Sequence, residues 1–112
     1  QTMLAHDLTT VDLVHREGRR VSDGLFSVIA RPNGLGHARL GLAVGVRAAG
    51  NAVKRNRVKR VVRETFRANL QELPSVDLVV NARPGAGQAS TTALRASVLA
   101  LWDRVRQRCA RS

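Results

Sequence analysis

The stretch NAVKRNRVKRVVRETFR, residues 51–67, decides the fold. It contains no Gly or Pro, so nothing in it forbids a helix, which should run to about Leu73 because Pro74 stops it. On a wheel of about 100° per residue, one side gathers the residues for a core, namely Val58, Val61, Val62, Thr65 and Phe66. The adjoining side, across about 140°, carries Asn56 and five cations, namely Arg55, Lys59, Arg60, Arg63 and Arg67. The sequence therefore predicts a helix with a core face and a cationic face.

The segments on either side of this helix predict strands. Residues 38–46 alternate strictly, with Leu and Val on one face. The other face carries Arg39, Gly41, Ala43 and Gly45. Residues 76–82 form a nearly continuous apolar run, as in a strand covered on both faces. A strand, a long helix and another strand in succession favour a βαβ unit with a parallel strand pair.

The Gly-rich face of residues 38–46 is nearly bare of side chains, so another group can approach its backbone closely. Two interpretations stay open. Either a helix packs tightly on this face, or the face is one wall of a groove that holds an extended strand of nucleic acid.

The remaining segments predict a small mixed domain. Residues 7–17 favour a short helix, residues 25–31 a strand, and residues 91 onward a final helix with one buried side. The turn residues at 32–36 favour an antiparallel hairpin between the strands at 25–31 and 38–46. The order is α-β-β-α-β-α, with room for a short extra strand near Val21. The class is α+β, and residues 1–112 are expected to form a single domain with helices packed on a small sheet.

The charge of the chain points to a polyanionic partner. Its 19 Lys and Arg stand against 8 Asp and Glu, a net charge of +11. A compositional bias towards Arg would not explain the deficit of acids. A compact fold with this excess of positive charge is expected to bind nucleic acid or an anionic membrane. The clustering of the Lys and Arg residues on one helix favours nucleic acid. No stretch approaches the roughly 20 apolar residues of a membrane span, so no membrane partner is expected.

Cysteine and histidine usage argues against structural cross-links and metal sites. The lone Cys109 allows no internal disulfide and no Cys-based zinc site, which fits a reducing, cytoplasmic location. The three histidines lack ligand spacing, and the acids are scattered singly. We therefore expect no protein-held metal and no catalytic residue in this chain. With no Tyr and few other aromatics, contact with nucleic acid should be mainly to the backbone.

The run at residues 55–64, RNRVKRVVRE, resembles the signature of the bacterial ribonuclease P protein subunit, a family that carries Arg-Asn-any-any-Lys-Arg with a further Arg. Residues 35–42 resemble that family's strand before the basic helix, and residues 72–82 resemble the strand after it. The Leu-Trp pair of the last helix also recurs. The resemblance covers nearly the whole chain from about residue 10, in keeping with a domain of this size.

The resemblance implies a fold of order αβββαβα with the basic helix in a left-handed βαβ crossover, against the usual hand. It also implies a function. In this family the RNA subunit performs Mg²⁺-dependent hydrolysis that removes the 5′ leader of precursor tRNA. The protein binds that leader and the catalytic RNA, so ribonuclease P RNA and precursor tRNA are the expected partners. Mg²⁺ is held mainly by the RNA, and no obligate protein partner is expected.

Two sets of site residues follow from the resemblance. The set expected to contact the leader comprises Arg55, Asn56, Lys59, Arg63, Val11, His15, Ser27 and Ile29. The set expected to contact the catalytic RNA comprises Lys54, Arg57, Arg60 and Arg67. Two departures from the family stand out. Its basic segment before the first helix is missing or trimmed in the given sequence, and Val11 and His15 stand where many members carry Phe. A protonated His15 near the leader would add a pH-dependent phosphate contact, whereas a neutral surface His would add none.

Two other functions stay open on composition alone. A ribosomal or chromosome-coating protein would use the same basic helix without any leader-binding groove. An independent protein nuclease would cleave RNA without an RNA subunit.

Overall fold

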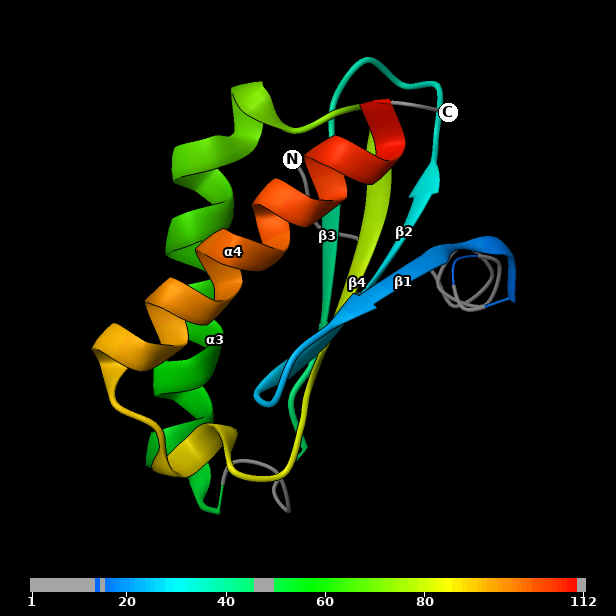
Figure 1. The fold of residues 1–112 in the computed structure, drawn as a ribbon. Helices are drawn as coiled ribbons and strands as arrows, with labels where there is room; N and C mark the ends of the chain where they lie inside the picture. Colours follow the sequence, from blue (N-terminus) through cyan, green and yellow to red (C-terminus); the bar gives the residue numbers. More distant parts are fainter. Residues whose placement is uncertain (1–13, 15, 46–49, 111–112) are drawn as a thin grey trace.

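The computed structural model describes residue 14 and residues 16–45 and 50–110, shown as coloured ribbon in Figure 1. The strands are β1 (Arg19–Ser22), β2 (Phe26–Pro32), β3 (Arg39–Ala43) and β4 (Val76–Ala82). The helices are α3 (Ala52–Asn69) and α4 (Thr91–Ala110), with short 3-10 helices η1 (Leu70–Glu72) and η2 (Ala86–Gln88). The short strand expected near Val21 is β1. The expected long helix is confirmed, because α3 and η1 together end at Glu72.

The four strands form one sheet in the order β1-β2-β4-β3. β4 runs antiparallel to β2 and parallel to β3, so the predicted parallel pair of a βαβ unit is confirmed. The predicted hairpin between β2 and β3 is wrong, because β4 lies between them. The apolar run of β4 is buried on both faces and requires an inner position, whereas β3 is half-exposed and takes the edge.

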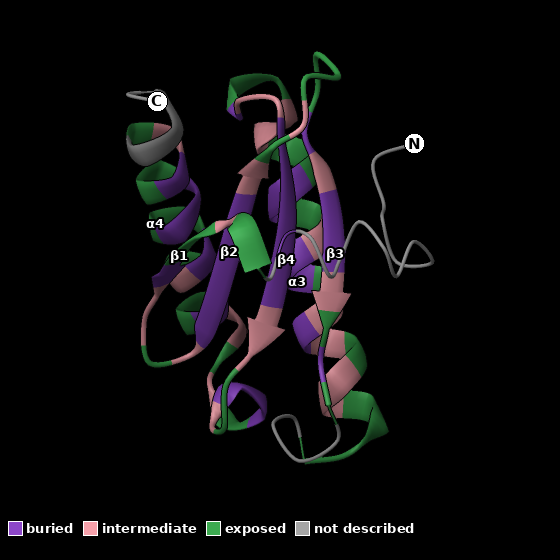
Figure 2. Cartoon of the chain, turned by 90° about the vertical axis from the view of Figure 1, so that its right-hand side faces the viewer, coloured by how far each residue is buried: buried purple, intermediate pink, exposed green. Residues whose placement is uncertain are grey.

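The crossover between β3 and β4 is left-handed. Figure 2 views the sheet with both strands running downward, β3 to the right of β4, and α3 behind them. The chain therefore leaves β3, passes behind the sheet through α3, and returns to the strand on its left. This is the hand that the family resemblance implies, and the opposite of the usual right-handed connection.

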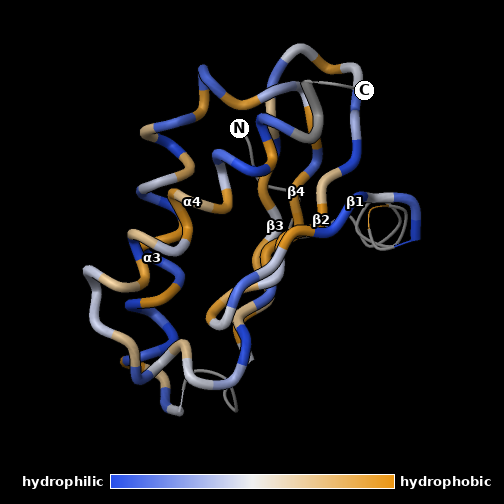
Figure 3. Tube along the Cα trace, in the orientation of Figure 1, coloured by the Kyte–Doolittle hydropathy of each residue, from blue (hydrophilic) through white to orange (hydrophobic). Residues whose placement is uncertain are grey.

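Both long helices cover the same face of the sheet (Figure 1). The main core lies between these helices and the sheet. It includes Phe26, Leu40, Leu78, Phe66 and Trp102. Figure 3 shows hydrophobic residues concentrated on the strands and alternating with hydrophilic ones along the helices. We call the opposite face of the sheet the open face, since neither α3 nor α4 covers it.

A smaller apolar cluster lies on the open face, where Val14 packs with Ile29 of β2 and Val79 of β4. Val14, Arg16 and Glu17 are helical and are followed by Gly18, whose N–H donates to the carbonyl of Val14 at 2.8 Å. A Cβ at Gly18 would lie 2.5 Å from that carbonyl oxygen, so only glycine fits here. Within the described residues, the helix expected at 7–17 therefore ends on the open face, directly before β1.

The Gly-rich face of β3 is covered at one part and exposed at another. Gly41 is buried and pairs with Val79, which lies under Val14, so helical residues do pack close to this row. Ala43 and Gly45 are exposed, so the face opens to solvent beyond the end of β3. The part that could border a groove is the end where α3 begins.

A buried hydrogen bond joins α3 to α4. The indole Nε1 of Trp102 donates to Thr65 Oγ1 at 3.3 Å, and the Thr65 hydroxyl donates back to the carbonyl of Val61 at 2.9 Å. Phe66 meets the Trp102 ring edge to face, with centroids 6.1 Å apart. The contact fixes the angle between the two helices and hence the direction in which the cations of α3 point.

Replacing Thr65 with valine should lower the free energy of unfolding by about 1–2 kcal/mol, because the indole N–H keeps its burial and loses its acceptor. Urea unfolding followed by the fluorescence of Trp102 measures this. Thr92→Val, at an exposed threonine of α4, is the control and should change stability by less than about 0.5 kcal/mol. Equal stability of the two variants would contradict the assignment of this bond.

Candidate nucleic-acid interface

Three cations of α3 form a column, with Arg55, Lys59 and Arg63 spaced four residues apart on one side of the helix. All three are half-buried. Burial of its ammonium group lowers the pKa of Lys59, and the charges of Arg55 and Arg63 lower that pKa further. The column is therefore a set of like charges held close together by the helix. A row of phosphates beside it would relieve the repulsion.

Arg55 connects this column to the edge of the sheet. Its Nε donates to the carbonyl of Val44, directly beyond β3, at 2.7 Å. Asn51 caps the start of α3, because its side-chain oxygen accepts from the N–H of Lys54 at 2.9 Å. The cap stabilises the first turn of the helix, and the Arg55 bond holds that turn against the chain just beyond β3. The other N–H groups of the Arg55 guanidinium can still contact an anion.

A shallow hollow of about 430 Å³ runs along the outer side of α3. Its lining residues are Asn56, Arg60, Arg63, Glu64 and Arg67. Asn56 and Arg63 were assigned to the leader, and Arg60 and Arg67 to the catalytic RNA. The structure thus brings members of both predicted sets into one surface, with no boundary between them. Which RNA each residue contacts stays a prediction.

Arg57 has a structural role that the sequence did not reveal. Its Nη2 donates to the carbonyls of Gly87 and Ala89, at 2.8 and 2.7 Å. These bonds hold the η2 segment against α3. Lys54, the other half-buried member of the predicted catalytic-RNA set, lies one turn earlier on the helix. The assignment of both residues to RNA contact stays a prediction, and Arg57 could serve it only alongside its bonds to the loop.

The sheet side of the predicted leader site is less accessible than expected. Ser27 and Ile29 do lie on the open face, but only 6% and 1% of their surface is exposed. Ile29 packs under Val14, and the hydroxyl of Ser27 accepts a hydrogen bond from Arg20 Nη1 at 3.0 Å. Direct contact of Ile29 with a ligand does not fit this burial, which gives it a packing role instead. Val11 and His15 lie outside the described residues.

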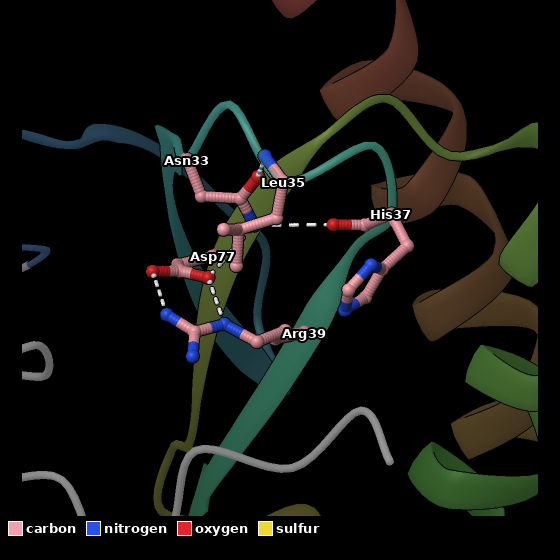
Figure 4. Close-up of polar contacts among 5 residues, drawn as sticks. All are labelled: Asn33, Leu35, His37, Arg39 and Asp77. Atoms are coloured by element: carbon pink, nitrogen blue, oxygen red, sulfur yellow. Dashed lines mark hydrogen bonds and ion pairs between the residues drawn. The ribbon is translucent and has the colours of Figure 1, made fainter.

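A charged network around Asp77 lies on the open face and was not predicted from the sequence (Figure 4). Asp77 of β4 is 2% exposed, and its two oxygens accept from Nε and Nη2 of Arg39, both at 2.8 Å. Asn33 donates to the same carboxylate at 2.9 Å and to the carbonyl of His37 at 3.1 Å. The network ties the loop between β2 and β3 to the central strand. The sequence did contain one sign of this network, because Asp77 is the single acid inside the apolar run at 76–82.

The charge state of Asp77 follows from this network. Burial raises the pKa of the carboxyl group, but hydrogen bonds from Arg39 and Asn33 and the charges of Arg39 and Arg31 lower it, and the net direction is downward. Asp77 is therefore ionised throughout the neutral range. It neutralises cations at this end of the open face, away from the α3 column.

No helix in the described residues is long and apolar enough to cross a membrane. Within the same residues, no three His, Cys, Asp or Glu side chains come together in a way that could hold a metal ion.

Comparison with known proteins gives one family. The family model described as Ribonuclease P matches residues 9–106. The ribonuclease P protein component of Thioalkalivibrio sulfidiphilus is 42% identical over 97 residues, covering 87% of this chain and 81% of that protein. That of Photorhabdus laumondii subsp. laumondii is 40% identical over 91 residues, covering 81% and 76%.

Solved structures give the same result for the fold. The RNase P protein from Staphylococcus aureus superposes with a TM-score of 0.85 at 27% identity, covering 92% of this chain and 94% of that one. The RNase P protein from Thermotoga maritima gives a TM-score of 0.78 at 32% identity, covering 93% and 97%. The sheet order and the crossover described above are thus found within a fold already known in experimental structures.

Proposed function

The chain belongs to the ribonuclease P protein family, and from the geometry of its basic helix we propose that it binds the 5′ leader of precursor tRNA together with the catalytic RNA. The column of Arg55, Lys59 and Arg63 carries this proposal. It stands beside the open end of β3, to which Arg55 is bonded. A single-stranded RNA passing between the column and the sheet would place its phosphates against the guanidinium and ammonium groups.

The contribution of the protein is electrostatic and positional. The lowered pKa of Lys59 reflects burial together with the repulsion of its neighbours, and that repulsion disappears when phosphates occupy the column. Binding energy of this kind is sequence-independent and falls with salt. The outer hollow along α3 would contact the catalytic RNA through Arg60 and Arg67, which are exposed. One helix would then touch both RNAs and hold the leader in register with the cleavage site.

We assign the hydrolysis to the RNA subunit, with Mg²⁺ held mainly by that RNA. The described residues do not fit a protein-held Mg²⁺, since they contain no cluster of three candidate ligands. The chain thus acts as the accessory protein subunit of an endoribonuclease that makes the mature 5′ end of tRNA. Because tRNA is processed where it is made, the cytoplasm is the compartment that this function requires.

Reconstitution with a bacterial ribonuclease P RNA tests the proposal. At low Mg²⁺ concentration, adding the protein should raise the rate of 5′ cleavage of precursor tRNA by about tenfold or more, equivalent to about 1.4 kcal/mol. The measurement is the single-turnover rate with the RNA alone, with the protein alone, and with both. Cleavage by the protein alone would indicate an independent nuclease. No stimulation of the RNA would indicate a structural nucleic-acid-binding protein instead.

A further inference from the structure

A row of residues crosses the open face at the end of the sheet where β3 and β4 finish (Figure 2). Strand pairing places Ser22 of β1 opposite Ser27 of β2, Ser27 opposite Asn81 of β4, and Asn81 beside Ala43 of β3. Neighbouring strands lie about 4.8 Å apart, so Asn81 is one strand from Ser27 and one from Ala43. Polar side chains thus occupy the middle of the row, at the end where the face opens to solvent.

Asn81 differs from its neighbours in having an unused amide. It is half-buried, and its side chain makes no hydrogen bond to any residue that the structure describes. The Ser27 hydroxyl, by contrast, already accepts from Arg20. A carboxamide has two N–H donors and an acceptor oxygen, and a half-buried one is held by the strand in a nearly fixed direction. Ala43 beside it is exposed and small, which leaves room above the strand.

Cations stand at both ends of this row. On the β1 side, Arg20 lies two residues before Ser22, is exposed, and donates to Ser27 of the row. At the other end, Arg55 is bonded to the carbonyl of Val44, the residue after Ala43. An amide lying between two arginine positions matches a nucleotide strand, which has phosphates at intervals and a base between them that carries donors and acceptors.

We propose that Asn81 reads a base of the single-stranded leader and sets the base preference at one leader position. The inference rests on the proposed function, because it needs the leader to cross the open face. Single-stranded RNA is recognised through the edges of bases that are splayed out of a stack, and a carboxamide pairs with such an edge by two hydrogen bonds. Arg55 and Arg20 would hold the phosphates on either side, so the amide adds selectivity rather than general affinity.

The test uses the reconstituted holoenzyme and precursor tRNAs whose leader carries each of the four bases at each of the positions nearest the cleavage site. We expect the unaltered protein to prefer one base at one position by about fivefold to tenfold in binding. Asn81→Leu, which keeps the size of the side chain, should reduce that preference to about onefold and leave binding of mature tRNA unchanged. Gln71→Leu removes an exposed amide at the opposite end of the sheet and should preserve the preference.

The outcomes separate this inference from the proposed function. If the holoenzyme does not bind precursor tRNA better than mature tRNA, the leader-binding function itself fails. If it does, and Asn81→Leu retains the full base preference, or no base preference exists, then Asn81 is only a packing residue. Thermal unfolding of the variant checks its fold. Asn81→Asp, which keeps the shape and removes both donors, provides the same test should the leucine variant be unstable, and must also change the preference.

Discussion

Replacing Asp77 with alanine is expected to lower the free energy of unfolding by about 3 kcal/mol. The carboxylate is buried and bonded through both oxygens to Arg39, with a third bond from Asn33. Its removal takes two hydrogen bonds from the Arg39 guanidinium and one from the Asn33 amide at a buried position. We choose the lower end of the range for breaking a buried pair, because 25% of the Arg39 side chain is exposed to water.

Urea unfolding followed by Trp102 fluorescence measures this loss. Glu17→Ala is the matched control, because it breaks the exposed pair between Glu17 and Arg31, whose atoms are 3.0 Å apart. That variant should lose less than about 1 kcal/mol. A double change, Asp77→Leu with Arg39→Met, removes both charges and should recover much of the loss. Equal stabilities of Asp77→Ala and Glu17→Ala would show that the network contributes nothing beyond a surface pair.

The same network predicts a pH dependence of stability. The pKa of Asp77 is lowered in the folded chain, so folding is favoured at pH values above the unfolded pKa of about 3.9. That contribution is lost as the pH falls through the folded pKa, since the unfolded chain then binds the proton more readily. Asp77→Asn should therefore flatten the loss of stability between neutral pH and pH 3. Asp23, whose pKa is also lowered, keeps its own contribution in that variant.

Removing the column on α3 should weaken binding of precursor tRNA most of all. Lys59→Ala or Arg63→Ala alone should cost about 1 kcal/mol or more, and the triple variant with Arg55→Ala should cost about 2–3 kcal/mol, since adjacent charges do not add fully. Each phosphate contact to a single strand contributes about −0.7 to the slope of log K against log salt. The triple variant should therefore flatten that slope by about 2. Titration of labelled precursor and mature tRNA at several salt concentrations measures both quantities.

The control for the column is Arg95→Ala on α4. Arg95 is about half exposed, and its contact with Glu64 is long, at 3.8 Å, so the variant removes one positive charge with little effect on the fold. It should leave binding of precursor tRNA nearly unchanged. Equal losses for precursor and mature tRNA in the column variants would reject the assignment of these cations to the leader, although the chain could still bind the catalytic RNA.

The sequence predicted local elements well and the order of strands poorly. The basic helix follows from its own apolar spacing, and the inner strand 76–82 from its continuous apolar run. The prediction of an antiparallel hairpin was wrong because the turn residues at 32–36 indicate only that the chain reverses direction there. They do not determine which strand pairs with β2. Whether β2 then pairs with β3 or admits β4 depends on contacts between residues more than forty positions apart, such as Asn33 and Asp77. No local pattern carries that information.

The candidate site shows the same division. The α3 cations were predictable because a helix fixes which side chains share a side. The role of Arg57 was not, since its partners Gly87 and Ala89 belong to a distant loop. Ser27 was expected to line the site. It does lie on the open face, but it is buried there and its hydroxyl accepts a hydrogen bond from Arg20. Asn81 was overlooked because its significance depends on the residues beside it on other strands.

The inner position of β4 has a consequence for how the protein is made. Synthesis delivers the residues of β2, β3 and α3 before Val76, so the cations of α3 are made while the strands flanking β4 still lack their common partner. The sheet can close only through contacts that are distant in the sequence, which are slow to form. Until then the nascent chain offers its cations to any RNA without the sheet that orients them. On the proposed function, selective binding of the leader therefore requires residues 76–82 to be in the sheet.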